Sequence, residues 1–203
     1  VSAGYKYAGL FGKVTGTYTK KATVMNVGLI NAEVQSGAMG NSNLTYGGSV
    51  VGYGSNIILR DVYNKSSSSG VAITAKPYQT YAQTINSSTY YPVRYKAIVG
   101  GIAGHLDSST VSSVYNSGTV SNGAGIIGEL VDSSLSDAYN SGTIYNIAEY
   151  NGTTAAKQYS IVKNISGSTV KNVYDSGSQI LQNYAYATQP RTYDLELAPD
   201  TSG

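Results

Sequence analysis

The 203-residue chain has no cysteine, no tryptophan, one phenylalanine, one histidine and four prolines. Without cysteine it has no disulfides, thiolate metal sites or cysteine nucleophiles. Its single histidine, His105, rules out a site built from several histidines and is expected to be a solvated residue after a strand. Only 12% of residues are charged, and Lys20-Lys21 is the longest run of like charge, so no nucleic-acid partner is expected. No apolar run approaches the roughly 18 residues of a membrane span.

Apolar residues nevertheless make up 41% of the chain, and the polar part consists mainly of Ser, Thr, Asn and Gly together with 20 tyrosines. Disordered chains combine low hydrophobicity with high charge, and this composition does neither. Tyr and Thr suit the pleated surface of a sheet, whereas Gly and Asn suit corners. The composition therefore favours an all-β fold.

One short sequence occurs twice in the middle of the chain. Gly101 opens one copy and Gly125 the other, 24 residues later, and each runs from Gly-apolar-apolar-Gly to Tyr-Asn-Ser-Gly-Thr. Three further copies contain residues 50–64, 160–177 and, in degenerate form, 9–27. A recurring unit too short to bury its own apolar face must stack on its neighbours, so the chain is predicted to be an array.

Each unit reads as three short strands: the apolar pair between the glycines, then residues 110–115 and 118–120 in the Gly101 copy, with Asn-Ser-Gly as a turn. Such units predict a parallel β-solenoid (β-helix) of about five irregular coils, rising about 4.8 Å per coil. Equivalent side chains would then stack in rows. The predicted rows are a core row (Ile102, Ile126, Ile161), a tyrosine ladder (Tyr63, Tyr115, Tyr139, Tyr174) and a corner row (Asn64, Asn116, Asn140, Asp175).

The uneven intervals between copies indicate loops that leave the solenoid. We expect a solenoid domain over residues 1–180, insertions near 65–97 and 145–159, and a C-terminal tail over 181–203. The first insertion has room for a further degenerate coil as well as a loop. Since insertions in solenoids often carry binding functions, its aromatic and basic residues form a candidate interaction surface: Tyr78, Tyr81, Tyr90, Tyr91, Arg94, Tyr95 and Lys96.

Two acids occupy similar places in neighbouring copies. Asp107 and Asp132 lie 25 residues apart, so they could stack as the paired carboxylates of a glycosidase. Each is followed by serines, and this pattern favours a polar turn in which the aspartate caps the backbone. No catalytic residue, metal ligand or cofactor site is predicted.

The repeat resembles the GLUG repeat, whose core is Gly-Leu-apolar-Gly; Gly9-Leu10-Phe11-Gly12 is the most literal match. The resemblance covers about five units between Gly9 and Ile180 and departs from the pattern at Ser160 and Lys163, which replace the bracketing glycines of the last unit. GLUG repeats occur in secreted and surface proteins of bacteria, including filamentous adhesins. The resemblance implies a parallel β-solenoid in an extracellular setting and implies no catalytic residue.

We therefore expect a non-enzymatic structural or adhesive element of the bacterial cell surface, whose partners are other copies of itself or neighbouring repeats, with host or surface glycans as further candidates. Open ends of a parallel solenoid favour end-to-end assembly into a filament. The alternative is a carbohydrate-binding module that uses exposed tyrosines. A polysaccharide-cleaving β-helix enzyme is a third hypothesis, which would need a cluster of acids or basic residues on one face.

Overall fold

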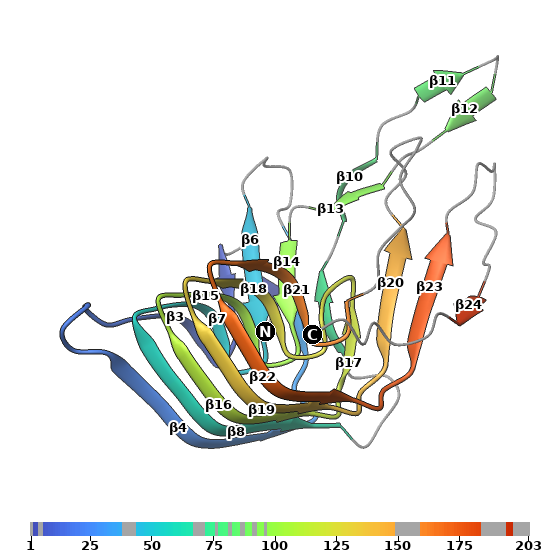
Figure 1. Ribbon diagram of the computed structural model, residues 1–203. Helices are drawn as coiled ribbons and strands as arrows, with labels where there is room; N and C mark the ends of the chain where they lie inside the picture. Colours follow the sequence, from blue (N-terminus) through green and yellow to red (C-terminus); the bar gives the residue numbers. More distant parts are fainter. Residues whose placement is uncertain are drawn as a thin grey trace.

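The computed structural model describes residues 2–3, 6–37, 44–66, 72–75, 77–80, 83–85, 88–90, 93–95, 97–148, 159–183 and 194–196. These residues form strands and no helix. Strands from successive units pair side by side and in parallel, so the predicted all-β, parallel β-solenoid is confirmed (Figure 1).

Two five-stranded parallel sheets contain one strand from every coil. We call them sheet C and sheet D. Sheet C consists of β3 (Phe11–Thr15), β7 (Val51–Ser55), β15 (Ala103–Asp107), β18 (Ile127–Val131) and β21 (Val162–Ser166). Sheet D consists of β4 (Ala22–Ile30), β8 (Ile57–Lys65), β16 (Thr110–Asn116), β19 (Ser134–Asn140) and β22 (Thr169–Asp175).

Two further sheets complete the coils. Sheet A consists of β1 (Ser2–Ala3), β5 (Val34–Ser36), β9 (Ala72–Ala75), β17 (Thr119–Ser121), β20 (Ile144–Ala148), β23 (Gln179–Asn183) and β24 (Asp194–Glu196), of which only β24 runs antiparallel to its neighbour. Sheet B consists of β2 (Tyr7–Ala8), β6 (Thr45–Gly48) and β14 (Ala97–Gly100). The sequence predicted three strands per unit and missed sheet B. The first three coils therefore have four sides.

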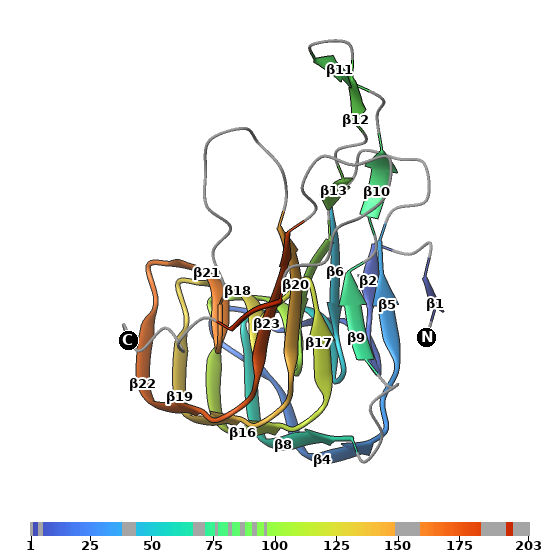
Figure 2. The same cartoon turned by 90° about the vertical axis from the view of Figure 1, so that its right-hand side faces the viewer.

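The insertion near residues 65–97 begins with a strand of the solenoid, because β9 pairs in parallel with β5 and β17. The rest of its described part forms two antiparallel pairs, β10 (Pro77–Thr80) with β13 (Val93–Tyr95) and β11 (Gln83–Ile85) with β12 (Ser88–Tyr90). Figure 2 shows these pairs projecting from one side of the solenoid. They are an excursion rather than a further coil.

The apolar core lies in two compartments. The larger lies between sheets C and D and includes the predicted row of Ile102, Ile126 and Ile161, which are linked by backbone hydrogen bonds from coil to coil. The smaller involves sheets A and B and includes Val34, Ile73, Val99 and Val120. Each compartment is lined by the inner faces of its own two sheets. The outer face of sheet B is therefore available to contact the outer face of sheet C.

Left-handed backbone recurs at two fixed places in the coil. Within sheet D, the middle of each strand holds a non-glycine residue with φ between 52° and 57°: Asn26, Asp61, Ser113, Asp137 and Asn172. At the corner between sheets C and D the same conformation occurs at Asn56, Ser108, Asp132 and Gly167. Asn, Asp and Gly tolerate this region best, and here they bend the strand so that apolar residues on both sides of the bend face the core.

Candidate functional site

The candidate surface predicted in the first insertion lies largely beyond what the structure describes. Tyr78 belongs to β10, Tyr90 to β12, and Arg94 and Tyr95 to β13, but only the backbone of these strands is described. The remaining three predicted residues, Tyr81, Tyr91 and Lys96, are not among the described residues. The candidate functional side chains that the structure describes therefore lie on the sheets of the solenoid and not on this insertion.

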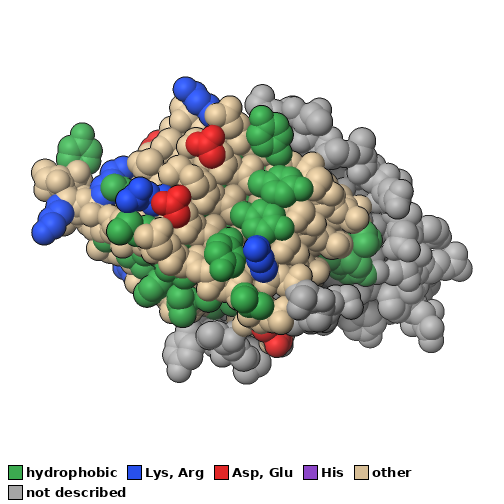
Figure 3. All heavy atoms as spheres, turned by 90° about the horizontal axis from the view of Figure 1, so that it is seen from below, with side chains coloured by type: hydrophobic (Ala, Val, Ile, Leu, Met, Phe, Trp, Pro, Cys, Tyr) green, Lys and Arg blue, Asp and Glu red, His purple; other side chains and the backbone are tan. Residues whose placement is uncertain are grey.

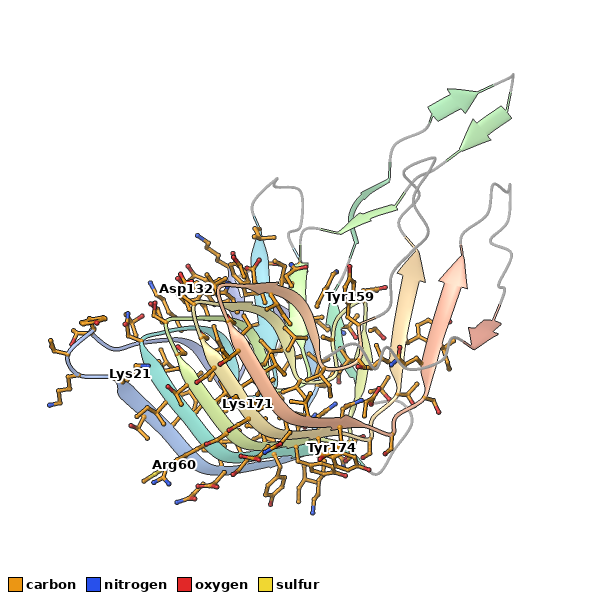
Figure 4. All side chains as sticks on the ribbon, in the orientation of Figure 1. Lys21, Arg60, Asp132, Tyr159, Lys171 and Tyr174 are labelled. Atoms are coloured by element: carbon orange, nitrogen blue, oxygen red, sulfur yellow. The ribbon has the colours of Figure 1, made fainter. Side chains whose placement is uncertain are left out.

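The four repeat tyrosines occupy equivalent positions on the outer face of sheet D. Strand pairing aligns Tyr63 with Tyr115, Tyr115 with Tyr139, and Tyr139 with Tyr174. The rings of Tyr115 and Tyr139 stack with centroids 5.5 Å apart, and the Tyr115 hydroxyl lies 2.9 Å from Ser141 Oγ. That hydrogen bond lowers the pKa of Tyr115. Figure 3 shows hydrophobic side chains on this lower face, and Figure 4 shows Tyr174 pointing away from the core.

Beside the tyrosines runs a row of buried amides. Asn64 Nδ2 donates to Asn116 Oδ1 at 2.9 Å, Asn116 Nδ2 to Asn140 Oδ1 at 2.9 Å, and Asn140 Nδ2 to Asp175 Oδ1 at 2.8 Å. Asn116 also donates to the carbonyl of Gly118 and accepts from its N–H, which closes the turn of its own coil. Each side chain thus fixes its own corner and the stacking of the next coil.

The acids Asp107 and Asp132 do not occupy equivalent positions. Asp107 pairs with Val131, so Asp132 falls one position later, at the left-handed corner. The polar turn is confirmed, but serine rather than aspartate caps the backbone. Ser109 Oγ donates to the Asp107 carbonyl at 2.6 Å and accepts the N–H of Ile57 from the preceding coil. A serine oxygen can do both at once, whereas a carboxylate can only accept.

His105 contradicts the expectation of a solvated residue after a strand. It lies within β15 with 9% of its surface exposed, and its Nδ1 is 2.6 Å from Glu129 Oε2. Its ring stacks on Tyr53 at 4.7 Å between centroids and contacts Tyr46 at 5.0 Å. Tyr7 completes this aromatic corner, 5.1 Å from Tyr53 and 6.1 Å from Tyr46.

The aromatic corner joins two rows of outward-facing side chains. Sheet C supplies the row that strand pairing aligns as Lys13, Tyr53, His105, Glu129 and Asn164. Sheet B supplies Tyr7 and Tyr46, which pair with each other. In Figure 1 strands β6 and β14 rise steeply from the level of β7 and β15. The ring contacts of Tyr7 with Tyr53 and of Tyr46 with His105 show that side chains of sheet B pack against those of sheet C there.

Glycines allow the two sheets to meet this closely. The second glycine of each motif, Gly52 or Gly104 for example, has no room for a side chain: a Cβ on Gly104 would lie 2.5 Å from Gly47 N, and one on Gly52 would lie 2.8 Å from Ala8 N. Each such glycine meets the strand of sheet B from the preceding coil, so Gly128 of the fourth coil still lies against Ile98 and Val99 of β14. The last coil has Lys163 there, and no described strand of sheet B comes from the coil before it. The glycine is thus tied to the presence of sheet B, which explains the departure from the repeat.

The electrostatic setting of the corner differs from that of the tyrosine ladder. Burial, and then the negative charge of Glu129, raises the pKa of Tyr46. Burial, and then Asp107, raises the pKa of Tyr53. At the other end, Lys6 Nζ lies 5.5 Å and Lys13 Nζ 5.8 Å from the centroid of the Tyr7 ring. The corner is thus acidic at Glu129 and basic at the two lysines.

Sequence reasoning missed this corner, although one signal was available. Lys13, Tyr53, His105 and Glu129 all follow the second glycine of a motif directly. Their shared place in the repeat aligns them, but a repeat is recognised where residues are similar, and at this position they differ. Tyr7 and Tyr46 precede the repeated motif and carry no such signal.

Among the described residues no group of three or more His, Cys, Asp or Glu side chains could hold a metal ion. The same part of the chain contains no helix long and apolar enough to cross a membrane. No model of a known protein family matches the chain, and comparisons with curated proteins and with solved structures also found no match. The chain is therefore characterised by its fold, a parallel β-solenoid.

Proposed function

We propose that this chain is a non-enzymatic, GLUG-type structural or adhesive element of an extracellular bacterial surface protein, and that it stacks end to end with further copies of itself. The observation that carries the proposal is the state of the two ends of the solenoid. Each end presents rows of the apolar core that are fully covered in the middle coils.

The core rows show this directly. Phe11 in the first coil is 40% exposed, whereas Val51, which pairs with it, is buried. Ile165 in the last coil is 55% exposed, whereas Leu130 beside it is buried. In the described part of the chain, no strand pairs with the outer edges of β3 and β4 or of β21 and β22. Open edges above exposed apolar side chains favour pairing with another chain.

Within sheets C and D the two ends also match each other in register, whereas in sheet A the outer edges of β5 and β23 are already paired with β1 and β24. A second copy stacked in the same direction would place β21 next to β3 and β22 next to β4. Because the rows run unbroken through the five coils, Ile165 would then lie beside Val14, and Val173 beside Val27. The exposed Tyr174 would lie beside Gly28, over which the Tyr63 ring of the second coil already lies, so that the two rings would meet there. Such a head-to-tail contact does not close on itself and generates filaments.

The test uses the two ends separately. Phe11→Lys places a charge at the first coil and Ile165→Lys at the last, on side chains exposed enough for lysine to be accommodated. We expect sedimentation velocity to show oligomers of the unaltered protein that grow with concentration, and monomers for either variant. A mixture of the two variants retains one intact junction and should form dimers but nothing longer.

Ser112→Lys is the matched control. It adds the same charge in the middle of sheet D, in the row that already contains Arg60 and Lys171, and should leave assembly unchanged. Circular dichroism verifies that all variants are folded. A monomeric unaltered protein at the highest concentrations, or equal disruption by Ser112→Lys, would refute the stacking.

A further inference from the structure

We propose that the aromatic corner between sheets B and C binds an acidic sugar, that is, a polysaccharide residue bearing a carboxylate or sulfate group. The site would comprise Lys6, Tyr7, Lys13, Tyr46 and Tyr53. The corner faces outward from the side of the solenoid, but Lys6, Tyr7 and Lys13 belong to the first coil, so binding is measured on the monomeric variant Ile165→Lys, which leaves the first coil unaltered.

The tyrosines of the corner are surface groups rather than core residues. Ala8, beside Tyr7, belongs to the buried cluster of sheets A and B, and Val51 belongs to that of sheets C and D. Tyr7, Tyr46 and Tyr53 belong to neither cluster and are only half-buried. Three phenol rings within 6.1 Å of one another therefore form an aromatic cluster that is partly exposed to solvent.

Two positive charges stand over these rings without a carboxylate partner. Lys13 Nζ lies 5.8 Å from the Tyr7 centroid and 5.6 Å from that of Tyr53, and Lys6 Nζ lies 5.5 Å from that of Tyr7. Both lysines are exposed, and neither forms an ion pair within the described residues. Glu129 is paired with His105 and lies three strands away from Lys13 in the row, so it forms no ion pair with either lysine. The pair of ammonium groups is complementary to one anionic group.

The rings and charges together select the class of ligand. Aromatic faces pack against the C–H face of a pyranose, phenol hydroxyls bond its hydroxyl groups, and the lysines bind its carboxylate or sulfate. A nucleic acid would need an extended basic track along its backbone, and the whole chain carries a net charge of only +2. The corner thus favours a single charged sugar over a polyphosphate.

Isothermal titration calorimetry at low salt tests the proposal with five probes. These are tetragalacturonate, a chondroitin sulfate tetrasaccharide, neutral maltotetraose, and acetate and sulfate ions alone. We expect at least one acidic tetrasaccharide to bind at least about tenfold more tightly than maltotetraose and than either ion, since stacking and charge act together. Binding by neither acidic probe, equal binding of maltotetraose, or equal binding of the free ions would overturn it.

Variants locate the site. The double variant Lys6→Gln/Lys13→Gln should weaken binding of the acidic tetrasaccharide at least about tenfold, and Tyr7→Ala should do the same. The control double variant Lys20→Gln/Lys171→Gln, which removes two positive charges from exposed positions outside the corner, should change it less than twofold. An oligothymidylate is the competing polyanion. If it binds as tightly as the sugar, or if the double variant binds like the unaltered protein, the assignment is wrong.

Discussion

Two rows of side chains cross the same five coils and differ in one respect. The row on sheet D repeats one residue type, tyrosine, in four successive coils. The row on sheet C holds a different residue in every coil, from Lys13 through His105 to Asn164. Identical neighbours at a strand spacing of about 4.8 Å present like surfaces to one another, as in the stacked rings of Tyr115 and Tyr139. Different neighbours bring distinct chemical groups together, which is what a binding site requires.

The largest effect should come from breaking the buried amide row that accompanies the tyrosines. Asn116→Leu keeps the branched shape but leaves Asn64 Nδ2 and the N–H and carbonyl of Gly118 without the side chain that they bond. Because unsatisfied buried polar groups each cost about 1–3 kcal/mol, we expect a loss of about 4 kcal/mol in the free energy of unfolding. Urea denaturation measures it.

Asp175→Asn is the control for the amide row, since it sits at its end and still offers an oxygen to Asn140. It should cost less than about 1 kcal/mol. Similar losses for the two variants would show that position along the row does not matter.

The row on sheet C can be disrupted through the glycine that precedes it in each motif and packs against sheet B. In Gly104→Ala the new Cβ would lie 2.5 Å from Gly47 N and 2.6 Å from Gly52 O, so sheets B and C must separate. Overpacking of this kind costs about 2 kcal/mol and should loosen the contacts of His105 with Tyr53 and Tyr46. Urea denaturation and the near-ultraviolet circular dichroism of the tyrosines report both changes.

Lys163→Ala alters the same motif position in the last coil, beyond the described strands of sheet B. We expect less than about 1 kcal/mol there. A loss equal to that of Gly104→Ala would show that packing against sheet B is not the reason for glycine at this motif position.

The smallest expected effect is at alkaline pH, where tyrosines of the two rows should change the free energy of unfolding in opposite directions. The pKa values of Tyr46 and Tyr53 are raised, so the folded state holds their protons longer, and the stability they contribute is lost as pH rises above about 10. The pKa of Tyr115 is lowered, so its contribution is present at high pH and is lost as pH falls through its folded value. Tyr53→Phe should therefore flatten the alkaline decline in the free energy of unfolding, and Tyr115→Phe should steepen it. Shifts in the same direction for both variants would contradict the contrast between the rows.

The sequence alone predicted the rows that repeat. Ile102, Ile126 and Ile161 can be aligned from the repeat because identical stacking demands make similar residues recur. Sheet B was not predicted, since its strands, such as Tyr7–Ala8 and Thr45–Gly48, share little beyond short apolar or small residues. Strand pairing there depends on backbone hydrogen bonds and on neighbouring glycines, and neither leaves a side-chain pattern.

His105 shows the limit of reading residues singly. A lone histidine next to a glycine has no chemical partner nearby in the sequence, so solvent exposure is the natural expectation. Its partners Tyr53 and Glu129 stand 52 and 24 residues away and become neighbours only once the coils are stacked. The same repeat interval aligns His105 with Glu129. Because the residue type at this position changes from coil to coil, the alignment could not be recognised from the sequence.

The left-handed residues in the middle of the sheet D strands have a consequence for how the chain avoids folding errors. Coils this similar could pair one residue out of phase, and most backbone hydrogen bonds would still form. Such a slip would move the residue after each bend, Val62 or Val114 for example, into a conformation with positive φ. The penalty is about 1–2 kcal/mol per residue, and higher for a β-branched side chain. The left-handed bend, repeated in every coil, therefore favours pairing of the sheet D strands in a single register.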